Sequence, residues 1–71
     1  MLKVGQKVMV KNDLVVDKFY GGGRFHAGMA KYKGMKGEVL GVKHYDKTKY
    51  GISVECEGYD WTAEMLEVLQ D

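Results

Sequence analysis

The sequence predicts a small, mainly β fold made of short, strongly bent strands. Apolar and polar residues alternate in several short runs, which is the period of a half-buried strand. Glycine accounts for ten of the 71 residues, about twice its usual share of roughly 7%, and it separates these runs. A chain of this length holds one hydrophobic core, so we expect a single domain over residues 1–71.

The first strand is predicted over residues 7–11, because Val8 and Val10 fall on one face under the two-residue period. A long connection, residues 12–36, separates it from the next strand. Connections of that length are uncommon inside compact domains and often carry function. Residues 14–20 are expected to run as an extended arm, which reverses at three consecutive glycines.

The second half of this connection predicts a short helix over residues 26–32. Phe25, Met29 and Tyr32 recur at spacings of four and three, which places them on one helical face. Gly34 stands where a helix C-cap is expected. We therefore expect the three large side chains to pack onto the sheet.

The second strand is predicted over residues 37–43, with a bulge or bend at Gly41. Val39 and Val42 lie three residues apart, so strict alternation cannot bury both. A polar hairpin leads to the third strand, residues 50–56, which alternates most clearly. Its buried face is predicted to carry Tyr50, Ile52, Val54 and Cys56, the last as a structural thiol.

Three short elements complete the chain. Residues 59–61 predict a fourth strand, Thr62 is expected to cap one helical turn through Met65, and residues 66–68 close the fold as a fifth strand. Trp61 is expected to bridge the sheet and the long connection. The predicted sheet core consists of aliphatic residues: Val8, Val10, Val39, Val42, Ile52, Val54, Leu66 and Val68.

Five short strands, a long first loop that contains a short helix, and a helical turn before the last strand describe a small SH3-like five-stranded barrel. Such a barrel is a bent sheet folded onto itself, and its curvature needs glycines and bulges. The segment Tyr32-Lys33-Gly34-Met35-Lys36-Gly37-Glu38-Val39-Leu40-Gly41-Val42 resembles a KOW motif, found in some ribosomal proteins and transcription elongation factors. In that family the flanking loops contact RNA or protein, so the resemblance implies that Lys33 and Lys36 lie near a partner.

A second resemblance spans nearly the whole chain. Its features are Val4-Gly5-Gln6-Lys7-Val8, Phe19-Tyr20-Gly21-Gly22, the set Phe25, Met29, Tyr32 and Gly34, and Gly58-Tyr59-Asp60-Trp61-Thr62-Ala63-Glu64-Met65-Leu66-Glu67. In these features the sequence resembles small SH3-like-barrel proteins of phages and prophages of Gram-positive bacteria. The resemblance implies a fold and a bacterial host cell as the setting, and no activity. More distantly, the sequence is similar to the SH3-like repeats of some ubiquitin-ligase scaffolds, which bind peptides.

The residues that catalysis needs are mostly missing. Cys56 is placed on a buried face without a positioned base. His26 and His44 lack the spacing of a metal pair, and no GK[ST] follows the three glycines to form a nucleotide site. Glu55 and Glu57 share a face, and we expect that face to be solvated. We therefore predict no enzyme, no cofactor and no metal.

The sequence also predicts a cytoplasmic protein. No apolar run approaches the roughly 18 residues of a membrane span, and the N-terminus lacks the apolar block of a signal peptide. A lone cysteine fits a reducing compartment. We expect no membrane partner, and the oligomeric state stays open.

Charge is distributed unevenly along the chain. Residues 1–43 carry nine Lys and Arg against three acids, whereas residues 44–71 carry two Lys against seven acids. These charges either pair across strands or leave a basic face that attracts nucleic acid. For the second alternative the candidate contacts are Lys31, Lys33, Lys36 and Lys43.

Eight aromatic residues are more than so small a core can fully hide. In SH3-like barrels the groove beside the long first loop commonly takes ligands, and here the candidate contacts are Phe19, Tyr20, Arg24, Tyr59 and Trp61. We therefore expect a non-catalytic module that binds a host or phage protein. Two alternatives stay open, a KOW-like RNA- or DNA-binding domain and a structural or self-associating protein. The aromatic rings could also bury one another.

Overall fold

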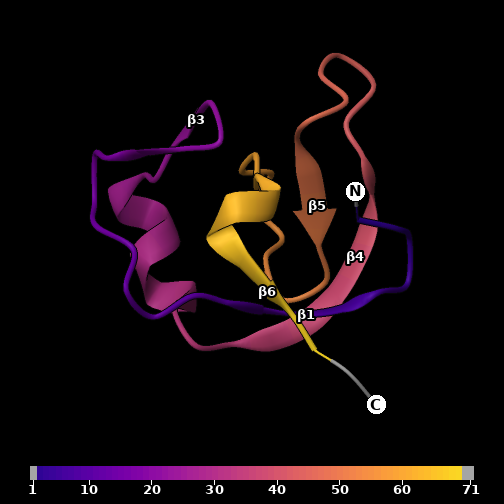
Figure 1. Ribbon diagram of the computed structural model, residues 1–71, viewed down its shortest axis with the longest axis horizontal. Helices are drawn as coiled ribbons and strands as arrows, with labels where there is room; N and C mark the ends of the chain where they lie inside the picture. The colour runs from indigo at the N-terminus through magenta and orange to yellow at the C-terminus, as the bar shows by residue number, and fades with distance from the viewer. Residues whose placement is uncertain (1, 70–71) are drawn as a thin grey trace.

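A four-stranded antiparallel sheet with the order β5-β4-β1-β6 forms the main body of the protein, and the two-stranded β2–β3 hairpin stands beside it (Figure 1). The computed structural model describes residues 2–69. The elements are β1 (Lys7–Val10), β2 (Phe19–Tyr20), β3 (Gly23–Arg24), the 3₁₀ helix η1 (Ala27–Tyr32), β4 (Lys36–Val42), β5 (Tyr50–Ile52), the 3₁₀ helix η2 (Ala63–Met65) and β6 (Leu66–Val68). The predicted mainly β class is confirmed. Within residues 2–69, β5 and β6 are the two edges of the main sheet, and no strand pairing joins them.

β1 is a central strand of the main sheet, and its apolar residues face the core. Val8 and Val10 are buried, and Val8 pairs with Gly37 on one side and with Val68 on the other. A Cβ on Gly37 would lie 2.8 Å from the Ser53 hydroxyl oxygen. Glycine therefore lets the chain that follows β5 approach β4 closely.

The predicted bulge in β4 is confirmed. The register with β5 shifts between Val39 and Gly41. Val39 is buried, but the prediction that Val42 lies in the core is wrong, because 40% of it is exposed and its cross-strand partner Tyr50 takes the buried place at this end of the sheet. Val68 was also expected in the core and is 44% exposed, since it ends an edge strand.

The third strand is shorter than predicted, and this changes the burial of the residues after it. β5 ends at Ile52, and the chain turns immediately, with the Glu55 backbone N–H donating to the Ile52 carbonyl at 3.2 Å. The turn interrupts the two-residue alternation, so Cys56 is exposed and Glu55 is buried, the reverse of both predictions. The predicted fourth strand reduces to one bridge between Trp61 and Tyr50.

The long connection contains the predicted tight turn and short helix, but residues 14–20 do not run as one extended arm, because the chain turns at Val16 and Asp17, where the Lys18 N–H donates to the Val15 carbonyl at 3.2 Å. Gly21 and Gly22 have φ values of 60° and 85°, the left-handed pair that a two-residue type I′ hairpin turn requires. The helix is η1, and Phe25, Met29 and Tyr32 are all buried. Figure 1 shows this hairpin and η1 on one side of the molecule and β4 and β5 on the other.

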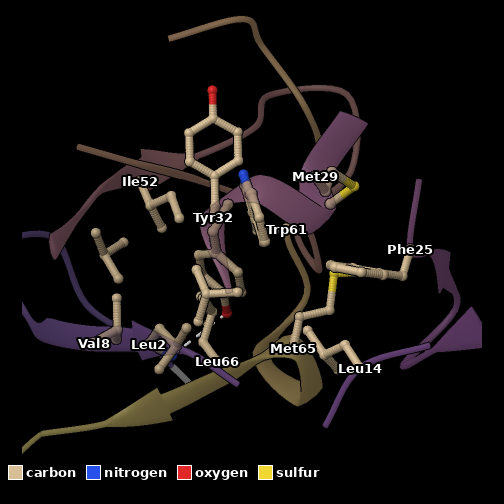
Figure 2. Close-up of a cluster of buried hydrophobic side chains, with 13 residues drawn as sticks. Leu2, Val8, Leu14, Phe25, Met29, Tyr32, Ile52, Trp61, Met65 and Leu66 are labelled. Atoms are coloured by element: carbon tan, nitrogen blue, oxygen red, sulfur yellow. Dashed lines mark hydrogen bonds between the residues drawn. The ribbon is translucent and has the colours of Figure 1, made fainter. Parts of the chain in front are cut away.

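Trp61 joins the two parts of the core, as predicted. It is fully buried, and its ring meets that of Tyr32 edge to face at a centroid distance of 6.1 Å. In Figure 2 it lies between Ile52 on the sheet side and Phe25 on the side of the long connection. All the buried hydrophobic side chains among residues 2–69 belong to this one cluster.

The helical turn before the last strand is confirmed as η2, but the predicted cap is wrong. The Thr62 side chain makes no cap hydrogen bond to η2. Its hydroxyl instead donates to the Tyr20 carbonyl at 2.7 Å. This contact joins β2 to the segment that follows Trp61.

Candidate functional site

An open groove of about 540 Å³ lies between the β2–β3 hairpin, the start of η1 and the loop before Trp61. We call it the aromatic groove. Its lining consists of Phe19, Gly22, Gly23, Arg24, His26, Met29, Lys49, Gly58, Tyr59 and Asp60.

The structure brings three of the five candidate contacts together. Phe19, Arg24 and Tyr59 line the aromatic groove, whereas Tyr20 and Trp61 do not. Tyr20 is the neighbour of Phe19 in β2, so its side chain leaves the opposite face of the hairpin, where its ring meets Phe25 edge to face. Trp61 is fully buried and acts as a core residue.

The hairpin supplies one wall of the groove. Phe19 and Arg24 are directly paired across β2 and β3, so their side chains leave the same face. Phe19 is 66% exposed and is one of several large hydrophobic residues at the surface among residues 2–69, but of these only Phe19 lines the groove. The Arg24 guanidinium lies 2.8 Å from Nε2 of His26 and 3.7 Å from the Asp17 carboxylate. Because a guanidinium can only donate, this His26 nitrogen accepts the hydrogen bond.

The loop that carries Tyr59 supplies the opposite wall, and a buried carboxylate holds it in place. Glu55 accepts hydrogen bonds from the backbone N–H groups of Glu57, Gly58 and Tyr59, the last two at 2.7 and 3.1 Å. It also accepts one from the indole N–H of Trp61 at 2.9 Å. These hydrogen bonds connect the loop to the buried Trp61, and one of them holds the backbone of Tyr59.

Two residues that the sequence analysis did not assign to the groove shape the space around Tyr59. The His26 ring lies 5.9 Å from the Tyr59 ring, centroid to centroid, at an angle of 34°. Gly28 in η1 lies against the phenol, and a Cβ there would collide with the Tyr59 hydroxyl. No sequence signal indicates either role, because each depends on a contact with a residue about 30 positions away.

The groove has three charged side chains, and two of them have close partners. Lys49 donates to the Asp46 carboxylate at 3.0 Å. Asp60 lies 3.7 Å from Lys43 and accepts a hydrogen bond from the Tyr45 hydroxyl, which raises the pKa of Tyr45.

Two of the four lysines proposed for nucleic acid have acidic partners. Lys31 pairs with Glu57 at 3.1 Å; this hydrogen bond raises the pKa of Lys31 and lowers that of Glu57, which also accepts from the Tyr32 hydroxyl. Lys43 pairs with Asp60, and Lys33 lies over the Phe25 ring at 5.7 Å. Lys36 begins β4, roughly 20 Å from Lys43 by strand geometry. Among residues 2–69, two ion pairs thus join the basic and acidic parts of the sequence, Lys31–Glu57 and Lys43–Asp60.

Within residues 2–69, no group of three or more His, Cys, Asp and Glu side chains could hold a metal ion. None of the helices in this part of the chain is long and apolar enough to cross a membrane. Comparisons with protein-family models, curated proteins and solved structures find no match to this chain.

Proposed function

We propose that the chain is a small, non-catalytic interaction module that binds an extended segment of another protein in the aromatic groove. The single observation that carries this proposal is the exposed Phe19 ring, which faces a groove of about 540 Å³. This volume lies within the range of about 300–1,000 Å³ that is typical of ligand pockets. A large apolar side chain kept in water beside a concave surface indicates a binding site, since burial of such a ring by a partner is favourable.

The stiffness of the opposite wall supports the same proposal. Tyr59 is held by the Glu55 hydrogen bonds, and Gly28 leaves the space that its hydroxyl occupies. A wall that is already ordered loses little conformational entropy when a ligand binds. Tyrosine in such a place combines apolar area with a polar hydroxyl group, as is common at binding hot spots.

We further propose that the main sheet is an SH3-like barrel and that the partner is a host or phage protein in a bacterial cytoplasm. The strand order, the bulge at Gly41 and the helical turn before β6 support the barrel. The resemblance to phage and prophage proteins supports a partner in the bacterial cytoplasm.

Binding of random peptides tests this function. We would select 12-residue peptides from a display library on the wild-type protein, and measure the affinity of the enriched peptide for Phe19→Ala and Tyr59→Ala. Each variant should weaken binding at least tenfold, because each removes an aromatic wall of the groove. Leu40→Ala is the matched control, since Leu40 is 61% exposed on β4 and does not line the groove.

Gly28→Ala offers an independent variant. The new Cβ would collide with the Tyr59 hydroxyl and force the ring from its place on the groove wall, so affinity should fall, and circular dichroism checks that this variant folds. The proposal is wrong if no peptide is enriched, or if the groove variants bind as well as Leu40→Ala does.

The nucleic-acid alternative has a separate test. A random single-stranded oligonucleotide at roughly 50 mM salt should not bind, because two of the four candidate lysines are already paired with acidic side chains. Binding that falls steeply with salt and is lost in Lys33→Gln and Lys36→Gln would favour the KOW-like function instead.

A further inference from the structure

We propose that the segment bound in the aromatic groove carries an acidic side chain, and that its carboxylate pairs with Arg24 while a neighbouring apolar side chain lies against Phe19 and Tyr59. This inference rests on the proposed function and specifies the chemistry of the partner. It follows from the charges around the groove and from the position of Arg24 beside Phe19.

Among the charged side chains that line the groove, Arg24 has the most exposed ion pair. Lys49 lies 3.0 Å from Asp46 and is largely buried, and Asp60 has both Lys43 and the Tyr45 hydroxyl as partners. The carboxylate nearest to Arg24, that of Asp17, is 3.7 Å away and its side chain is 72% exposed. An ion pair at that distance and exposure contributes little. A ligand carboxylate could therefore replace or join Asp17 at small cost.

The Arg24 guanidinium contacts Asp17 and His26 and still has N–H groups without a partner among the described residues. Its contact to Asp17 is made through Nε, and one Nη2 hydrogen is directed at His26. Five N–H groups are available on an arginine, so the two Nη1 hydrogens and one on Nη2 stay free. They suit a carboxylate, whose two oxygens match the planar fork.

The pairing of β2 with β3 sets where an apolar side chain of the ligand would lie relative to Arg24. Arg24 and Phe19 are cross-strand partners with Cβ atoms about 5 Å apart. Side chains two residues apart on an extended peptide project to the same side, at a spacing of about 7 Å. An acidic residue two positions from a large apolar residue therefore fits the guanidinium and the Phe19 ring at the same time. A basic residue there would meet the positive charge of Arg24.

A double-mutant cycle tests the assignment. The probe is the peptide enriched from the 12-residue library, together with its analogue in which the acidic residue is replaced by its amide. On the wild-type protein, the amide analogue should bind about tenfold more weakly. On Arg24→Gln, the two peptides should differ by less than about twofold. Lys3→Gln is the matched control, because it removes an exposed positive charge whose residue does not line the groove.

Asp17→Asn provides a test by gain of affinity. Asp17 has φ 71°, a conformation that asparagine accepts readily, so the fold should be preserved. Removal of this competing carboxylate should tighten binding of the acidic peptide by about two- to fivefold and leave the amide analogue unchanged.

The outcomes distinguish this inference from the function it rests on. If the enriched peptides lack an acidic residue but still depend on Phe19 and Tyr59, the groove binds proteins and the Arg24 inference is wrong. An acidic preference that persists in Arg24→Gln also overturns it. If no peptide depends on the groove residues, the proposed function fails with it. Circular dichroism on each variant confirms that the fold is retained.

Discussion

Glu55 connects the core of the protein to its candidate binding surface. Its carboxylate is buried, and every described hydrogen bond to it comes from the loop that ends at Trp61. A buried carboxylate without partners would destabilise the fold strongly, but this one has four N–H donors. One side chain therefore both completes the core around Trp61 and positions Tyr59.

Glu55→Gln tests this role. The amide has nearly the same shape, but it replaces one accepting oxygen with an NH₂ group that faces backbone N–H donors. We expect a loss of about 2 kcal/mol in the free energy of unfolding, measured by urea denaturation. Glu67→Gln, at an exposed position on β6, should change it by less than about 0.5 kcal/mol. Equal losses in the two variants would contradict the role of Glu55.

Asp46 links stability to acid pH. Its carboxylate accepts hydrogen bonds from the Thr48 hydroxyl, the Thr48 backbone N–H and Lys49, which lower its pKa to about 2. The unfolded chain lacks these bonds and binds a proton at higher pH, near 3.8. The stabilisation is therefore fully present above about pH 4 and is lost as the pH falls toward 2.

Urea denaturation at several pH values between 5 and 2 measures this dependence. In Asp46→Asn the decline in the urea midpoint should be shallower than in the wild type, because one carboxylate with a lowered pKa is gone. Asp13→Asn, at an exposed position outside this hairpin, is the matched control for the loss of one negative charge. A parallel decline in wild type and Asp46→Asn would contradict the assignment.

At the scale of elements, the glycines of the β2–β3 turn and of the β4 bulge differ in their role. Gly21 and Gly22 occupy left-handed conformations in the turn between β2 and β3, whereas Gly41 lies in the bulge of β4 without a left-handed φ. A Cβ at Gly22 or at Gly41 would meet no atom within 4 Å. Gly22 and Gly41 therefore differ in backbone conformation, and both have room for a side chain.

Alanine substitution separates the two roles. Gly22→Ala should lower the free energy of unfolding by about 1 kcal/mol, because an L-residue is strained at a φ of 85°. Gly41→Ala should be neutral or stabilising, by up to about 1 kcal/mol, since alanine restricts the unfolded chain. Thermal unfolding of both variants measures the difference. A larger loss in Gly41→Ala would show that the bulge itself requires glycine.

The elements also show where local patterns stop being predictive. The spacing of Phe25, Met29 and Tyr32 was enough to predict a short helix with a buried face, and the structure confirms it. The alternation in residues 50–56 was not enough, because the chain leaves the sheet after Ile52. Sequence periodicity does not show where a strand ends when the following residues can still alternate. The burial of Glu55 and the exposure of Cys56 follow from that turn.

At the scale of the whole molecule, the long connection and the main sheet share one core. Trp61 pairs with β5 through Tyr50 and contacts η1 through Tyr32. Thr62 adds the hydrogen bond to Tyr20 in β2. Neither part has a hydrophobic cluster of its own within residues 2–69. The groove thus lies on a connection that depends on the sheet for its structure.

We expect the connection and the sheet to unfold together. Trp61 is the single tryptophan, so its fluorescence reports the junction, while far-ultraviolet circular dichroism reports the backbone of the whole protein. In urea the two signals should change at the same concentration, as for a single cooperative unit. A fluorescence transition at lower urea would show that the connection detaches first, and would contradict the shared core.

The sequence by itself determined the elements whose signals are local: the first and last strands, the glycine turn, the bulge at Gly41 and the short helix with its buried face. These depend on the spacing of apolar residues and on glycine conformation, both of which act within a few residues. Only the tertiary structure decided that Phe19 is exposed and lines the groove, that the Arg24 ion pair is largely exposed, and that Lys31 and Lys43 pair with Glu57 and Asp60. The reason is that burial and charge pairing depend on residues far apart in the chain, which come together only when the long connection folds against the sheet.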